Sequence, residues 1–211
     1  MKTNISFDVL QAVLWSITYI FILVYYCQYG TLSIHPFAVS SSFSWETVAL
    51  FLDLCRLVSI SRPGFLIHVF WFFLDLLIVA IYLFCCPPVC FSKQTFCLIC
   101  CGEVLLLFPI FIFFPDGMLL SSFIIDFLMA ASCLVFLLRE NIRFCVTSVL
   151  IGLLKLSGDA FAWLYYRDCH WLVNVIGILV LFLNTAFSLI LFLRRKDYSP
   201  GKAPRRRKKH R

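Results

Sequence analysis

Apolar stretches of about 20 residues recur from one end of this chain to the other, and they limit its fold more than any other feature. A transmembrane α-helix needs about 20 mostly apolar residues to cross the hydrocarbon core of a bilayer. Of the 211 residues, 62% are hydrophobic and only 14% are charged, whereas soluble domains contain about 25% charged residues. The pattern therefore predicts an all-α, polytopic integral membrane protein with no soluble domain.

Counting the apolar runs predicts a bundle of seven transmembrane helices within residues 1–193. The fourth run contains Glu103, and Pro109 is expected to kink it. The connections between runs are short, which predicts that neighbouring helices are antiparallel. The expected spans are about 9–29, 37–58, 64–84, 96–114, 118–138, 143–166 and 171–193.

A basic tail, residues 194–211, follows the last predicted span and includes Pro200 and Pro204, so we expect it to be disordered. Basic segments stay in the cytoplasm, and seven spans then place the N-terminus in the lumen. The last residues, Lys208-Lys209-His210-Arg211, resemble a dilysine retrieval signal, which predicts the endoplasmic reticulum. The tail is expected to contact anionic membrane lipids and no nucleic acid.

One carboxyl group, that of Glu46, stands inside the second apolar run, in Phe43-Ser44-Trp45-Glu46-Thr47. A charge at that depth costs roughly 3 kcal/mol or more, and burial disfavours the charged form of an acid. A neutral Glu46 can donate a proton to a substrate, and an interhelical hydrogen bond explains its position equally well. Asp53, seven residues further, shares its helix face, and an ion pair with Arg56 is the preferred explanation of that residue.

Other ionisable and polar side chains also fall inside the predicted spans. Asp75 lies in the third span and Asp126 in the fifth. Lys155 and Asp159 are four residues apart in the sixth span, so we expect a structural ion pair that faces the bundle interior. The last span is almost wholly apolar, and Asn184 is one of its few polar residues.

Four short motifs, in this order and spacing along most of the chain, resemble those of a known family. The family is the small seven-helix integral-membrane terpene cyclases of fungal meroterpenoid and indole-diterpene pathways. The motifs are Trp45-Glu46, Trp71 with Leu74-Asp75, the helix from Phe127-Leu128-Met129 to Leu138-Arg139, and Lys155-Leu156-Ser157-Gly158.

The resemblance implies a reaction and the residues that carry it. In that family a Trp-Glu glutamate and an aspartate of the last span are thought to protonate the epoxide of a prenyl chain, and the resulting cation closes rings. Glu46 matches the glutamate, whereas the position of the aspartate is occupied by Asn184. Asn184 would then orient Glu46 or the substrate oxygen, and Asp75 or Asp53 would supply the second acid. The expected substrate-binding residues are Trp45, Trp71, Asp53 and Phe187.

Two hypotheses of function follow. The first is a metal-independent terpene cyclase, a lyase or isomerase of secondary metabolism that acts on a hydrophobic prenylated small molecule and uses no cofactor. The chain lacks the Asp-rich signature of cyclases that ionise diphosphates, and the CxxC spacing of Cys97 and Cys100 lacks the further ligands of a zinc site. The second hypothesis is a non-catalytic seven-helix carrier or scaffold whose buried acids bind a proton or a substrate. The first requires Glu46 and Asn184 to face one apolar cavity.

Overall fold

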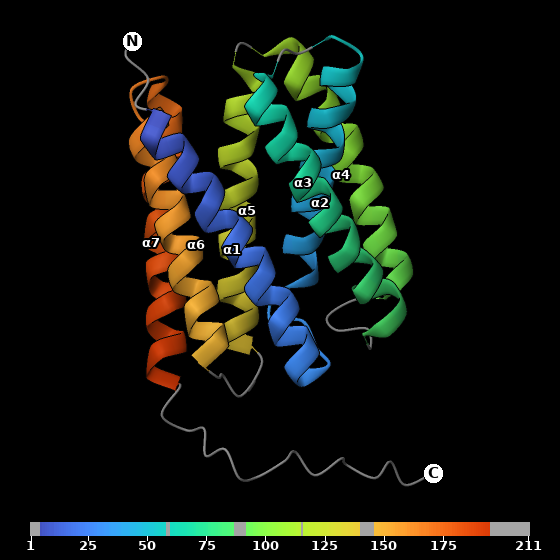
Figure 1. Ribbon diagram of the computed structural model, residues 1–211, viewed down its shortest axis with the longest axis vertical. Coiled ribbons are helices and arrows are strands. Elements are labelled where there is room, and N and C mark those ends of the chain that lie inside the picture. Colours follow the sequence, from blue (N-terminus) through green and yellow to red (C-terminus); the bar gives the residue numbers. More distant parts are fainter. Residues whose placement is uncertain (1–4, 58–59, 87–91, 115, 140–145, 195–211) are drawn as a thin grey trace, which may run out of the picture.

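The protein is an all-α bundle, as predicted, in a computed structural model that describes residues 5–57, 60–86, 92–114, 116–139 and 146–194 (Figure 1). A short π-helix, η1, continues α3, and the described residues contain no strand. The helices are α1 (Ile5–Tyr29), α2 (Pro36–Leu54), α3 (Arg62–Ala80), η1 (Ile81–Cys85), α4 (Lys93–Phe113), α5 (Gly117–Arg139), α6 (Val146–Tyr166) and α7 (Trp171–Arg194).

Local sequence signals explain where three of the helices begin. Pro36 opens α2, and the Nδ1 atom of the preceding His35 accepts a hydrogen bond from the backbone of the first turn at 3.2 Å. The hydroxyl groups of Ser61 and Ser92 cap α3 and α4 in the same way. Such caps satisfy amide groups that have no partner within the helix, and proline is tolerated in the first turn because its missing N–H is not needed there.

Within the described residues, six helices are long and apolar enough to cross a membrane, which indicates a multi-pass membrane protein. They are Val9–Tyr29, Arg62–Cys85, Lys93–Phe113, Gly117–Arg139, Thr147–Tyr166 and Trp171–Arg194. α2 is not among the six, because it carries a run of serines together with Glu46. It packs against α3, α4 and α5, and most of its residues are buried. A helix that is surrounded by protein does not need a surface that suits lipid.

The helices form two groups that α5 connects. α1, α6 and α7 pack together on one side of the bundle, and α2, α3 and α4 on the other (Figure 1). α5 contacts both α7 and α2, and α1 lies across α6 and reaches α3. The side chains of α1, α2, α3, α5 and α6 therefore meet in the interior between the two groups.

The prediction of an ion pair between Asp53 and Arg56 is wrong. α2 ends at Leu54, earlier than the predicted end of the second span, and Arg56 lies in the following turn with a φ of 59°. The Asp53 carboxylate instead accepts a hydrogen bond from the backbone N–H of Ile60 at 2.9 Å. Asp53 therefore holds the connection to α3 and forms no ion pair with Arg56, although both residues are described.

The basic tail beyond Arg194, with its Lys208-Lys209-His210-Arg211 sequence, lies outside the described residues. Arg194 itself is the last residue of α7 and donates a hydrogen bond to the carbonyl oxygen of Leu137 on α5 at 2.6 Å. This contact ties the ends of α5 and α7 together.

Candidate functional site

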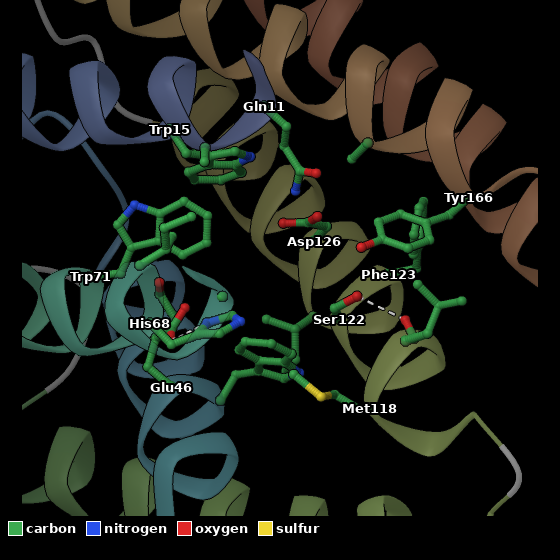
Figure 2. Close-up of a pocket in the computed structure, with 18 of the residues that line it drawn as sticks. Gln11, Trp15, Glu46, His68, Trp71, Met118, Ser122, Phe123, Asp126 and Tyr166 are labelled. Carbon is green, nitrogen blue, oxygen red and sulfur yellow. Dashed lines mark hydrogen bonds and ion pairs between the residues drawn. The ribbon is translucent and has the colours of Figure 1, made fainter. Parts of the chain in front are cut away.

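A cavity of about 500 Å³ lies between α1, α2, α3, α5 and α6. This volume is within the range of about 300–1,000 Å³ that is usual for small-molecule sites. Its acidic side chains are Glu46, Asp116 and Asp126. Its aromatic wall is formed by Trp15, Tyr19, Trp45, Trp71, Phe123 and Tyr166. Figure 2 shows several of these rings gathered around the space.

Glu46 reaches the cavity from α2 and pairs with His68 on α3. The Glu46 Oε2 and His68 Nδ1 atoms are 2.9 Å apart, and the two side chains are 5% and 14% exposed. The His68 ring lies between two indoles, with centroids 5.3 Å from Trp45 and 5.6 Å from Trp71. A carboxyl group beside an imidazole can hold and transfer a proton, so this pair has the chemistry that a general acid requires.

Hydrogen bonds fix the two indoles that flank His68. The Nε1 atom of Trp45 donates to the hydroxyl of Ser121 on α5 at 3.1 Å. The Nε1 atom of Trp71 donates to the hydroxyl of Ser16 on α1 at 3.0 Å. Both residues were predicted to bind substrate, and both line the cavity in fixed orientations.

Asp75, the alternative second acid, lies behind the cavity wall. Its Oδ2 atom accepts hydrogen bonds from the hydroxyl groups of Tyr19 at 3.0 Å and Ser42 at 2.9 Å. Tyr19 and Ser42 line the cavity, whereas Asp75 is 1% exposed and is not one of the lining residues. Asp75 is therefore linked to the site through two hydroxyl groups rather than exposed in it.

Asn184 is separated from the cavity by a buried ion pair. Its side-chain amide donates a hydrogen bond to Asp159, whose Oδ2 atom is 2.8 Å from the Lys155 Nζ atom. The predicted pair between Lys155 and Asp159 is thus confirmed. Asn184 and Phe187 are both buried on α7 and do not line the cavity. The structure therefore does not bring Asn184 to Glu46, and it brings neither Phe187 nor Asp53 to the cavity wall.

Two residues of the site, His68 and Asp126, were not selected from the sequence. Asp126 lines the cavity, with its Oδ1 atom 3.9 Å from Lys155 Nζ, and Figure 2 shows its carboxyl pointing into the space from the side opposite Glu46 and His68. The spacing of residues along each helix could have indicated both as site residues. His68 precedes Trp71 by three positions and Asp75 by seven, and Ser122 and Asp126 are four apart, which places each set on one helix face.

A further carboxyl group, that of Glu103 on α4, serves helix packing. Ser40 and Ser41 on α2 both donate to it, Ser41 at 2.5 Å, and Ser44 donates at 3.3 Å. Glu103 does not line the cavity. A half-buried acid in this bundle can therefore be held by the hydroxyl groups of three serines. The described residues contain no cluster of three or more His, Cys, Asp or Glu side chains that could hold a metal ion.

Comparisons of the chain with protein-family models, with curated proteins and with solved structures find no match. The terpene-cyclase resemblance of the four motifs therefore stays a prediction. The function has to follow from the chemistry of the cavity.

Proposed function

We propose that this protein is a membrane-embedded, terpene-cyclase-like enzyme in which Glu46 protonates the epoxide oxygen of a prenylated substrate. The observation that supports the proposal most is the position of the pair between Glu46 and His68 in the wall of an aromatic cavity. A general acid must lie within hydrogen-bond reach of the atom that it protonates, and Glu46 can reach a ligand in this space. His68 is a positioning residue that holds the carboxyl group.

The walls of the cavity suit a substrate that becomes positively charged during the reaction. Aromatic faces attract cations through their π-electrons, and indoles on both sides of the site are held by hydrogen bonds. The site lies within the bundle, and the apolar residues Ile67, Ile125 and Met129 also line it. A prenyl chain is apolar along its length and has the double bonds that ring closure consumes.

The proposed reaction is an isomerisation in which all atoms are retained. The O–H bond of Glu46 breaks and its proton passes to the epoxide oxygen, while the adjacent C–O bond of the epoxide breaks. The next double bond of the chain attacks the electron-poor carbon and closes a ring. The last cationic carbon loses a proton to a base and leaves a double bond. This proton balances the one that Glu46 supplied.

The proposed location is the endoplasmic reticulum membrane, with the C-terminus in the cytoplasm and the N-terminus in the lumen. The basic composition of the tail supports this orientation. Lining residues such as Gln11, Ser61 and Asp116 lie near helix ends on the same side of the bundle as the first turn of α1. In this orientation substrate enters from the lumenal side of the bilayer.

A specific observation favours the alternative of a non-catalytic carrier or scaffold. Glu103 and Asp159 are held by protein groups outside the cavity, so acids in this bundle do not require a reaction to explain them. Under this alternative the cavity binds a hydrophobic ligand, and Glu46 and His68 recognise one of its polar groups.

The experiment that tests the proposal supplies purified protein in lipid with epoxidised prenylated aromatic compounds and measures cyclised product of unchanged mass. Glu46→Gln is expected to lower the rate about 100-fold or more, the usual contribution of a general acid. Glu103→Gln is the matched control, because it makes the same change in a carboxyl group outside the cavity. Unchanged turnover in Glu46→Gln would refute the role of Glu46. Saturable binding of these compounds by the native chain without conversion would favour the carrier.

A further inference from the structure

One lysine faces two aspartates at the border between the cavity and α7. The Lys155 Nζ atom is 2.8 Å from Asp159 Oδ2 and 3.9 Å from Asp126 Oδ1. In an apolar interior one ammonium group balances one carboxylate, and a further unpaired charge is costly. Asp159 has the shorter contact and also receives the Asn184 amide. Lys155 is therefore the partner of Asp159, and Asp126 is left without a cation at a comparably short distance.

Asp126 is the carboxyl group of this cluster that reaches the cavity. Its side chain is 20% exposed, against 2% for Asp159, and it lines the space that Asp159 does not. Figure 2 shows it pointing inward near Gln11 and Tyr166. What balances Asp126 must therefore come from the cavity, either as a proton when the cavity is empty or as the positive group of a ligand.

The surroundings of Asp126 select an organic cation. Carboxylates and aromatic faces together bind amines and quaternary ammonium groups, and Trp15 already holds Lys155 over its ring, with Nζ 4.5 Å from the centroid. Metal cations such as Mg²⁺ and Ca²⁺ need several oxygen ligands, whereas much of this wall is aromatic or aliphatic. The apolar residues Ile67, Ile125 and Met129 also line the space, so the ligand should carry an apolar chain.

We propose that the cavity binds amphiphilic organic cations, with the charged nitrogen beside Asp126 and the apolar chain directed toward Trp45 and Glu46. This inference goes beyond the proposed reaction and stands whether or not the chain catalyses a cyclisation. If the cyclisation occurs, the same carboxyl group faces the cationic carbon of the intermediate.

The test compares farnesyl dimethylamine, which is protonated at neutral pH, with farnesol, which has the same chain and no charge. Binding to purified protein in an uncharged detergent is followed by tryptophan fluorescence, because Trp15, Trp45 and Trp71 line the cavity. We expect the native protein to bind the amine at least about tenfold more tightly than farnesol. Tenfold corresponds to a difference of about 1.4 kcal/mol in binding free energy. Asp126→Asn is expected to abolish this preference while it retains affinity for farnesol.

Two variants separate ligand recognition from damage to the fold. Glu103→Gln makes the equivalent change in a carboxyl group of α4 that does not line the cavity, and we expect it to keep the preference for the amine. Asp159→Asn leaves Lys155 free to pair with Asp126, so we expect it to lower the preference although Asp126 is still present. A damaged fold would instead weaken the binding of both compounds.

Equal binding of the two compounds by the native protein overturns the inference without any variant. A folded Asp126→Asn protein that still prefers the amine also overturns it, as does a loss of preference in Glu103→Gln as large as that in Asp126→Asn. If Asp126→Asn does not fold, Asp159→Asn and Asp126→Ser decide by the same comparison. None of these results depends on Glu46 or on product formation, which are measured separately.

Discussion

The Oε2 atom of Glu46 and the Nδ1 atom of His68 lie 2.9 Å apart and join α2 to α3 at the wall of the cavity. α2 is the more polar and more buried of the two helices, and α3 is one of the six apolar ones. A polar pair at such a position stabilises the contact between helices and also presents a carboxyl group to the cavity. Several properties of the protein should therefore respond to small changes around it.

Replacement of His68 by Phe tests the coupling within this pair. The side chain remains aromatic, but Glu46 loses its partner, and an unsatisfied buried group costs about 1–3 kcal/mol. We expect a lower unfolding temperature and slower product formation. The double variant Glu46→Gln with His68→Phe should be little worse than Glu46→Gln alone. Additive losses in thermal unfolding and in rate would show that the two side chains act independently.

Replacement of Gly158 by Ala tests the position of Trp15 in the cavity wall. A Cβ atom at Gly158 would lie 3.0 Å from Trp15 Cδ1 and 3.2 Å from its Nε1, so the indole must shift. We expect overpacking to cost about 1–3 kcal/mol and to weaken ligand binding measured by fluorescence. Gly102→Ala is the control, because its Cβ meets nothing within 4 Å and alanine is the better helix former. Equal behaviour of both variants would contradict the close contact.

Replacement of Lys155 by Met tests the buried ion cluster. Asp159 would stay buried without its cation. Removal of one partner of a buried pair lowers the free energy of unfolding by about 3–5 kcal/mol. The double variant Lys155→Met with Asp159→Asn removes both charges, and we expect it to recover much of the lost stability. Thermal unfolding in detergent measures both. A double variant as unstable as Lys155→Met would show that the pair itself is not the cause.

Replacement of Asn184 by Asp tests whether this position is a lost catalytic acid. The Asn184 amide donates to Asp159 and lies away from the cavity. A carboxyl group there loses the donor and adds a like charge, so we expect a loss of about 1–3 kcal/mol and no gain in cyclised product. Higher turnover in Asn184→Asp would place the second acid of the reaction at position 184 after all.

The stability of the α2 N-terminus should depend on pH through His35. Burial lowers the pKa of His35 below its ordinary value of 6.5, and its Nδ1 atom must be unprotonated to accept the capping hydrogen bond. The unfolded chain therefore takes up the proton first. The stability from this residue is present above pH 6.5 and is lost as the pH falls below that value toward the lowered pKa.

The measurement for His35 is the unfolding temperature between about pH 7 and about pH 5, the range in which histidine changes charge. His35→Asn keeps a side chain that can cap a helix but does not titrate there. We expect this variant to lose less stability than the native protein on acidification, by up to about 1 kcal/mol, the usual value of an N-cap. Parallel curves for the two proteins would assign the pH dependence to other groups.

Much of the helical architecture could be predicted, because it depends on residues that are close in the chain. The runs around α5 and α7 were placed almost at their observed ends, since their apolar length and flanking polar residues are local properties. The pair between Lys155 and Asp159 could be predicted because helix geometry alone brings positions four apart together. The prediction of a pair between Asp53 and Arg56 relied on the same helix geometry. It was wrong because α2 ends at Leu54, before Arg56.

The sequence by itself determined an all-α membrane bundle and a carboxyl group, Glu46, in its interior. Only the tertiary structure decided which groups meet that carboxyl: His68 is its partner, Asp126 faces the same cavity, and Asn184 donates to Asp159, which does not line the cavity. The physical reason is that residue spacing fixes which side chains share a helix face. It does not fix which other helix that face meets, because packing between distant segments settles that.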